Sequence, residues 1–165
     1  MTGRPTPRLI LLCGLPGSGK TTLAKHLGGQ LSAVRLCGDE WMARLGITLH
    51  DEQARDRIEV QFWLLAQDLL RLGQSVILES GFWLRSDRDE KRLGARVLGV
   101  AVHLQYLDVP PEELWRRLEL RNQSSTWAAV PISREQLEYW STLFEVPDQL
   151  ELDLFDSVEL GPARQ

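Results

Sequence analysis

The stretch Arg8–Leu31 reads RLILLCGLPGSGKTTLAKHLGGQL, and it decides the fold. Its first six residues predict a strand, apolar throughout as a strand covered on both faces should be. A glycine-rich loop follows from Gly14 to Gly19, and a helix is predicted from there to about Leu31. A strand, a glycine-rich loop and a helix in this order indicate an α/β protein.

The loop fits the pattern G-x-x-x-x-G-K-[ST], which is typical of phosphate binding. Glycines let backbone N–H groups approach phosphate oxygens, and the start of the helix adds positive potential. We expect Lys20 to reach the β- and γ-phosphates of ATP, and the Thr21 hydroxyl to ligate Mg²⁺. ATP and Mg²⁺ are the predicted cofactors, and the predicted cofactor-binding loop residues are Gly14, Leu15, Pro16, Gly17, Ser18, Gly19, Lys20, Thr21 and Thr22.

Strand-like and helical segments alternate along the chain, as in α/β folds with a parallel sheet. Further strands are predicted at 33–37, 75–79, 100–107 and, most weakly, 154–158. Helices are predicted at 39–45, 51–72, 85–98, from 110–111 onward and at 133–144, the last with a capping box of Ser133 and Gln136. The polar stretch 122–131 is a candidate lid. No linker divides the chain, so we expect one domain over 1–165, with 1–7 as a tail.

The length of 165 residues and a composition of 43% hydrophobic and 25% charged residues suit one globular domain. A net charge of -4 gives no global basic field for nucleic acid or an anionic membrane, although a local basic channel stays open. The apolar run Leu9–Cys13 is too short for a membrane span or a signal peptide. Cys13 and Cys37 lack metal-ligand spacing and favour buried thiols in a reducing compartment. We expect a cytoplasmic protein with no membrane partner; its oligomeric state is not set by the sequence.

Acidic residues close to the ends of two predicted strands are candidates for chemistry, because open α/β sheets bind ligands beyond the carboxyl ends of their strands. Asp39 follows the second strand, where it could orient an acceptor hydroxyl and take its proton, or only cap the short helix that follows. Glu79 ends the third strand like a Walker-B acid, and it could hold Mg²⁺, directly or through water, or contact the substrate.

Arginines suit a transferring phosphoryl group because their forked donors match its oxygens. Arg117 and Arg121 lie four residues apart on one predicted helix face beside the candidate lid; such a face is often only solvated, and Arg121 is the stronger candidate. Arg85, Arg88 and Arg92 begin the helix after the third strand, where they could face the acceptor.

Six tryptophans are many for this length. Three fall within predicted helices and are expected to pack: Trp63, Trp115 and Trp140. Three lie around the carboxyl edge of the sheet, in predicted loops or turns or in the short helix 39–45, where they could stack on a ring or pack: Trp41, Trp83 and Trp127. The candidate acceptor-binding residues are therefore Asp39, Trp41, Glu79, Trp83, Arg85 and Arg88.

Five segments carry a family resemblance: GLPGSGKTTLA (14–24), CGDEW (37–41), VILESGFW (76–83), YLDVPPEELWRRLELRN (106–122) and FEVPD (144–148). In this order they resemble small P-loop kinases of the polynucleotide-kinase, zeta-toxin, chloramphenicol-phosphotransferase and gluconate-kinase groups, which are ATP-binding kinases of the AAA type. The resemblance implies a three-layer P-loop NTPase fold. Its expected sheet has five parallel strands in the order 2-3-1-4-5, with helices on both faces and a small mobile lid.

The resemblance also implies roles for single residues. Asp39 is similar in position to the acceptor-activating aspartate, Arg121 to the lid arginine near ATP, and Arg117 to its neighbour. Two departures stand out. Glu79 occupies a position where relatives often have aspartate, and the segment ESGFW matches no known acceptor-binding pattern.

Three functions remain open from the sequence. The first is an ATP-dependent phosphotransferase that moves the γ-phosphate of ATP to a hydroxyl of a small molecule, with Lys20, Asp39, Arg117 and Arg121 as catalytic residues. The second is a polynucleotide 5′-hydroxyl kinase, which would need a basic path to the site. The third is a non-kinase ATPase or nucleotide-dependent switch.

Overall fold

A parallel sheet forms the centre of the computed structural model, which describes residues 6–124 and 130–157. Its strands are β1 (Arg8–Cys13), β2 (Val34–Leu36), β3 (Val76–Gly81) and β4 (Ala101–Tyr106), in the order β2-β3-β1-β4. All pairs are parallel, and Leu9 lies opposite Val76 on one side and Val102 on the other. The predicted order of the first four strands is therefore confirmed.

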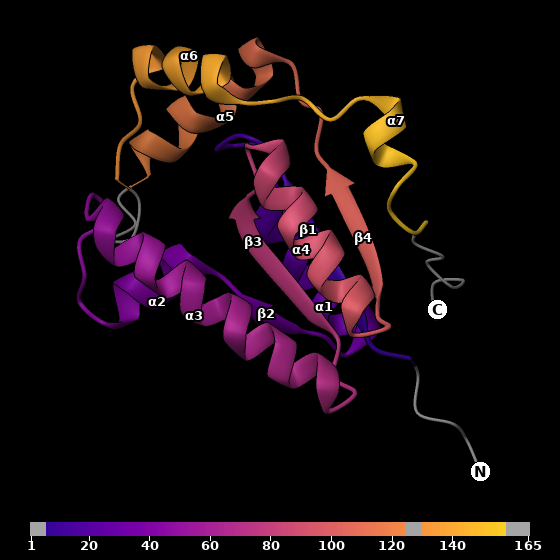
Figure 1. Cartoon of the computed structure of the whole chain (residues 1–165). Coiled ribbons are helices and arrows are strands. Elements are labelled where there is room, and N and C mark those ends of the chain that lie inside the picture. The colour runs from indigo at the N-terminus through magenta and orange to yellow at the C-terminus, as the bar shows by residue number, and fades with distance from the viewer. Residues whose placement is uncertain (1–5, 125–129, 158–165) are drawn as a thin grey trace.

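Helices cover both faces of this sheet (Figure 1). Helix α1 (Lys20–Leu31) packs on one face, and α3 (Glu52–Arg71) and α4 (Arg85–Val97) pack on the other. Alternate residues of β1 serve the two sides: Leu9 and Leu11 join the α3–α4 cluster, whereas Ile10 and Leu12 join the α1 cluster. Because both sides are buried, the strand is apolar at every position after Arg8.

Four further helices surround the carboxyl ends of the strands. They are α2 (Gly38–Arg44), α5 (Pro111–Gln123), α6 (Arg134–Leu143) and α7 (Gln149–Leu152). Figure 1 shows α5 and α6 above the tips of the strand arrows. Leu114, Leu118 and Leu137 pack these two helices together. The predicted capping box of Ser133 and Gln136 is present at the start of α6, whereas α7 was not predicted.

The predicted fifth strand is wrong over its described part. Residues 154–157 form a turn and irregular chain, and Val158 lies outside the described residues. The Asp156 N–H donates to the Val102 carbonyl at 2.9 Å, but the Val102 N–H donates to the Asp156 carboxylate at 2.8 Å. A side chain thus takes the place of the backbone acceptor that a fifth strand would offer, and the sheet has four strands in the described chain.

The candidate lid is described only in part, because residues 125–129 lie outside the described structure, Trp127 among them. Residues 122–123 belong to α5. Within the ranges 6–124 and 130–157, no helix combines the length and the hydropathy that crossing a membrane would need.

Candidate active site

The loop between β1 and α1 forms a backbone cradle. Gly17 and Gly19 have φ angles of 83° and 95°, which favour glycine. A Cβ on Gly14 would lie 2.7 Å from the Ser18 Oγ, and one on Gly17 would lie 3.0 Å from Leu118. The first turn of α1 contains no acidic residue, so its N–H groups are not opposed by a carboxylate. The geometry suits an anion.

Two side chains of the loop are placed for phosphate oxygens. The Lys20 ammonium donates to the carbonyls of Gly14 and Leu15 at 2.9 Å each, two of the three bonds that it can donate. Burial lowers the pKa of Lys20 to about 8, against the opposing effects of nearby acids. The Ser18 Oγ is buried and has no hydrogen-bond partner within the described residues. A bound phosphate would supply acceptors for both groups.

Thr21 and Glu79 lie together at the base of α1. The Thr21 hydroxyl donates to Glu79 Oε1 at 3.1 Å, and Arg35 holds Oε2 through bonds of 2.6 and 2.9 Å. Glu79 lies inside β3, two residues before its end, and not at the end as predicted. A hydroxyl and a carboxylate are oxygen ligands that suit Mg²⁺, so the pair fits the predicted metal. No group of three His, Cys, Asp or Glu side chains gathers as a metal site in the described ranges.

Asp39 is held by an ion pair between α2 and α3. It is the second residue of α2, whose N-cap is Cys37, so the alternative that Asp39 caps this helix is wrong. Its carboxylate lies 3.1 Å from the Arg55 guanidinium of α3. The side chain is 66% exposed, which leaves it accessible to a ligand.

Helix α5 places two arginines beside the loop. Arg117 donates to Glu113 at 2.7 Å, and its Nη1 atom lies 3.4 Å from the Gly17 carbonyl. Arg121 is one turn further along the same face and lines the same cavity. Arg117 therefore reaches the phosphate loop from the α5 side, and Arg121 lines the cavity beside it.

One cavity of about 910 Å³ collects most of the predicted site. Its volume is that of a small-molecule site. It is lined by the predicted residues Pro16, Gly17, Gly19, Lys20, Thr21, Thr22, Asp39, Glu79, Trp83, Arg117 and Arg121.

Arg88 lies apart from this cavity, contrary to the prediction that it could face an acceptor. It is fully buried and donates to Glu151 through bonds of 2.5 and 2.9 Å, and to the Phe82 carbonyl at 2.8 Å. Phe82 has a φ of 49°, unusual for a residue with a side chain. Arg88 therefore fixes the bend that follows β3 and carries Trp83.

Three further candidate acceptor contacts, Arg85, Arg92 and Trp41, are also absent from the cavity lining, whereas Asp39, Glu79 and Trp83 belong to it. Arg85 and Arg92 form ion pairs with Asp89 at 3.6 and 2.9 Å. Trp41 packs edge-on against Phe62, with ring centroids 5.0 Å apart. The basic path that a polynucleotide acceptor would need is therefore not formed by the start of α4.

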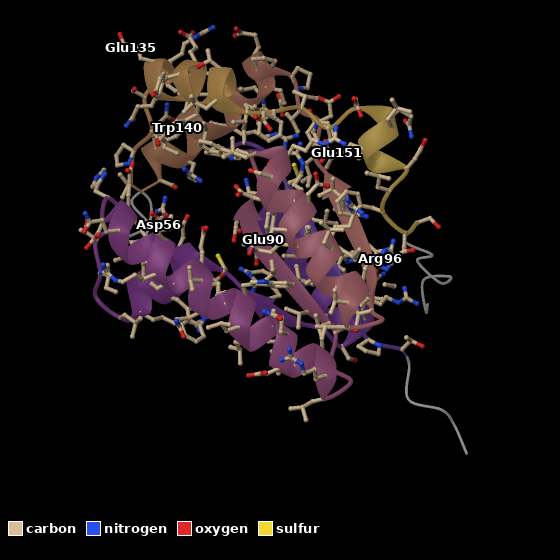
Figure 2. The ribbon with its side chains drawn as sticks, viewed as in Figure 1. Asp56, Glu90, Arg96, Glu135, Trp140 and Glu151 are labelled. Atoms are coloured by element: carbon tan, nitrogen blue, oxygen red, sulfur yellow. The ribbon has the colours of Figure 1, made fainter. Side chains whose placement is uncertain are left out.

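Sequence reasoning missed three residues around the site: Arg35, Arg55 and Trp140. Arg55 pairs with a residue 16 positions away and Arg35 with one 44 positions away, so no local spacing could reveal either pair. Trp140, expected only to pack, also lines the cavity, with its ring centroid 5.9 Å from that of Trp83. Figure 2 shows it on the side of α6 that faces α3.

The phosphate loop between β1 and α1, in a parallel sheet of order 2-3-1-4, defines a P-loop nucleotide-binding fold. Residues 9–147 match a family described as an AAA domain, and the chain belongs to this family. Comparison with curated proteins finds no match to the sequence.

Solved structures share the fold. A chain of the Pnkp1/Rnl/Hen1 RNA repair complex is 24% identical in sequence, with a TM-score of 0.69. The alignment covers 94% of the present chain and 48% of that chain, so the present chain spans about half of that protein's length. Kti12 from Chaetomium thermophilum, solved with ADP-AlF3, is 19% identical with a TM-score of 0.66 and coverages of 94% and 86%. A gluconokinase from Sinorhizobium meliloti 1021 is 20% identical with a TM-score of 0.60 and coverages of 88% and 79%.

Proposed function

We propose that this protein is an ATP-dependent phosphotransferase that moves the γ-phosphoryl group of ATP to a hydroxyl of a small molecule. The observation that carries the proposal is the single cavity in which the phosphate loop, Asp39 and Arg121 meet. Its volume of about 910 Å³ has room for a triphosphate and an acceptor together. The fold shared with a gluconokinase supports this reaction class.

Different residues act on the nucleotide and on the acceptor. Lys20 and the N–H groups of α1 bind the phosphates, and Arg117 and Arg121 neutralise charge that develops on the transferring group. The acceptor oxygen bonds to the γ-phosphorus, the bond to the β-phosphate oxygen breaks to release ADP, and Asp39 takes the hydroxyl proton. Arg55 orients the Asp39 carboxylate through their ion pair.

Thr21 and Glu79 would hold Mg²⁺, with water and nucleotide phosphate oxygens as its further ligands. The ion would supply positive charge to the phosphates. Arg35 binds Oε2 of Glu79 and so keeps Oε1 turned toward Thr21.

Replacing Asp39 with asparagine is expected to preserve ATP binding and to lower phosphoryl transfer by about 10²- to 10⁴-fold, because the amide cannot take the proton. ADP release with a panel of sugars, nucleosides and antibiotics measures transfer, and calorimetry measures ATP binding. Asp68→Asn is the matched control, since Asp68 also pairs with an arginine but on an exposed part of α3. Full transfer activity in the Asp39 variant would show that this carboxylate is not the base.

Nucleotide affinity should depend on pH through Lys20. Its lowered pKa of about 8 means that the side chain is charged below pH 8 and neutral above it, and only the charged form pairs with phosphate. The dissociation constant for ATP is therefore expected to rise about tenfold between pH 7 and pH 9, by proton linkage. Calorimetric titrations across this range measure the slope, and the Lys20→Ala variant should lack it. An unchanged dissociation constant up to pH 9 in the wild type would contradict the prediction.

The two other functions give different results in the same assays. A polynucleotide 5′-hydroxyl kinase would label a short 5′-hydroxyl oligonucleotide, and labelling would fall steeply with salt. A non-kinase ATPase or switch would hydrolyse ATP with no acceptor stimulating the reaction. The polynucleotide kinase is not our choice, because the arginines that begin α4 are engaged with Asp89 and Glu151. The ATPase or switch is not our choice, because the cavity beside the phosphate loop has room for an acceptor and includes Asp39.

A further inference from the structure

A second cavity, of about 510 Å³, lies between α3 and α4 and borders the first. We call it the α3–α4 groove. It shares three lining residues with the phosphate cavity: Asp56, Ser80 and Trp83. A molecule in the groove can therefore extend toward the phosphate loop. Figure 2 shows Asp56 on α3 and Glu90 on α4, the two helices that form its walls.

The charge of the groove is negative. Four carboxylates line it, two from α3 and two from α4: Asp56, Glu59, Asp87 and Glu90. Within the described residues, Lys91 is the only basic side chain in its lining, and its ammonium lies 2.9 Å from Glu90. Burial, assisted by Asp56 and Asp87 and opposed by Arg55, raises the pKa of Glu59 to about 7. At neutral pH Glu59 is therefore only partly ionised, and Asp56, Asp87 and Glu90 outnumber the one lysine.

The remaining lining is apolar and aromatic. Trp63 and Trp83 contribute half-buried rings, Phe62 and Phe82 lie buried behind them, and Val60, Leu64 and Leu84 are 59%, 51% and 42% exposed. Trp63 packs tightly against α4: a Cβ on Gly94 would lie 2.4 Å from its ring. Rings beside carboxylates suit the apolar face of a sugar or cyclitol and the amines that it carries.

We propose that the α3–α4 groove is the acceptor subsite and selects an amine-bearing polyhydroxyl compound over an anionic one. The inference rests on the proposed phosphotransferase function and names its substrate class. A hydroxyl at the end of the ligand beside Asp56 and Trp83 enters the phosphate cavity, where Asp39 lies. Protonated amines pair with the groove carboxylates, whereas carboxylate or phosphate groups on an acceptor are repelled.

Three oligosaccharide-sized probes that differ in charge test this inference: kanamycin, which carries amines, neutral maltotriose and anionic trigalacturonate. Each is titrated by calorimetry into the full chain saturated with Mg²⁺ and a non-hydrolysable ATP analogue. Kanamycin is expected to bind at least tenfold more tightly than maltotriose and to weaken with salt, and trigalacturonate to show no binding. Equal affinity for kanamycin and maltotriose, or no kanamycin binding, would overturn the inference.

The double variant Asp87→Asn/Glu90→Gln removes two groove charges outside the phosphate cavity. It is expected to weaken kanamycin binding at least tenfold and to leave acceptor-free ATP hydrolysis unchanged. Glu119→Gln/Glu135→Gln is the matched control, because it removes the same charge at exposed positions of α5 and α6 outside the groove lining. Figure 2 shows Glu135 on α6. Equal weakening in both double variants would overturn the subsite.

The same titrations separate this inference from the proposed function. If the protein does not bind the ATP analogue, the phosphotransferase proposal fails. If it binds the analogue but shows no preference for kanamycin, only the acceptor subsite fails.

Discussion

Lys20→Ala is expected to lower ATP turnover about 10³-fold, the loss seen when one preorganised donor to a developing oxyanion is removed. The Lys20 ammonium is buried in the loop, where two backbone carbonyls hold it and burial lowers its pKa. In this position it is already desolvated and oriented before the triphosphate arrives. Alanine would leave the phosphates with backbone N–H groups and Arg117 and Arg121 alone. Single-turnover ADP release and ATP calorimetry measure the two effects separately.

Lys25→Ala provides the control for this experiment, since Lys25 lies on the exposed side of the same helix. We expect it to match the wild type in ATP turnover. Thermal melting of both variants checks that the fold persists. Turnover within tenfold of the wild type in a folded Lys20→Ala protein would contradict the role assigned to the loop.

Arg88→Met is expected to reduce the free energy of unfolding by about 3–5 kcal/mol, the cost of leaving one partner of a buried ion pair without the other. Arg88 is fully buried, and its loss would strand the buried Glu151 carboxylate and remove donors from the Phe82 and Trp83 carbonyls. Urea unfolding followed by circular dichroism measures the change.

Two further variants keep this prediction testable if Arg88→Met fails to fold. Arg88→Met/Glu151→Leu removes both charges and is expected to regain much of the lost stability. Arg71→Met breaks an exposed pair with Asp68 and should cost less than about 1 kcal/mol. A loss below 1 kcal/mol for Arg88→Met would mean that the buried pair does not hold α7 and the Phe82 bend in place.

The sequence predicted best those features that depend on neighbours along the chain. The phosphate loop, the helix from Lys20 and the capping box at Ser133 each follow from local residue types, and all are present. The order of the first four strands followed from the family resemblance. Asp39, Glu79 and Arg121 were placed at strand ends or beside the lid, and the structure brings all three to one cavity.

Features that depend on distant partners could not be predicted in the same way. Arg88 looked like a cation near the acceptor because nothing nearby in sequence marks Glu151, 63 positions away, as its partner. The fifth strand failed because the Asp156 side chain occupies the edge of β4. The α3–α4 groove could not be predicted, because its carboxylates come from two helices whose packing cannot be deduced from the sequence.

The contact between Trp63 and Gly94 affects how closely α3 and α4 pack. A methyl group at Gly94 would lie 2.4 Å from the Trp63 ring, so the indole or α4 would have to move. The width of the α3–α4 groove therefore depends on a position that lines neither cavity. Under the proposed function, one substitution at Gly94 would change which acceptors fit and would leave the residues around the phosphate loop unchanged.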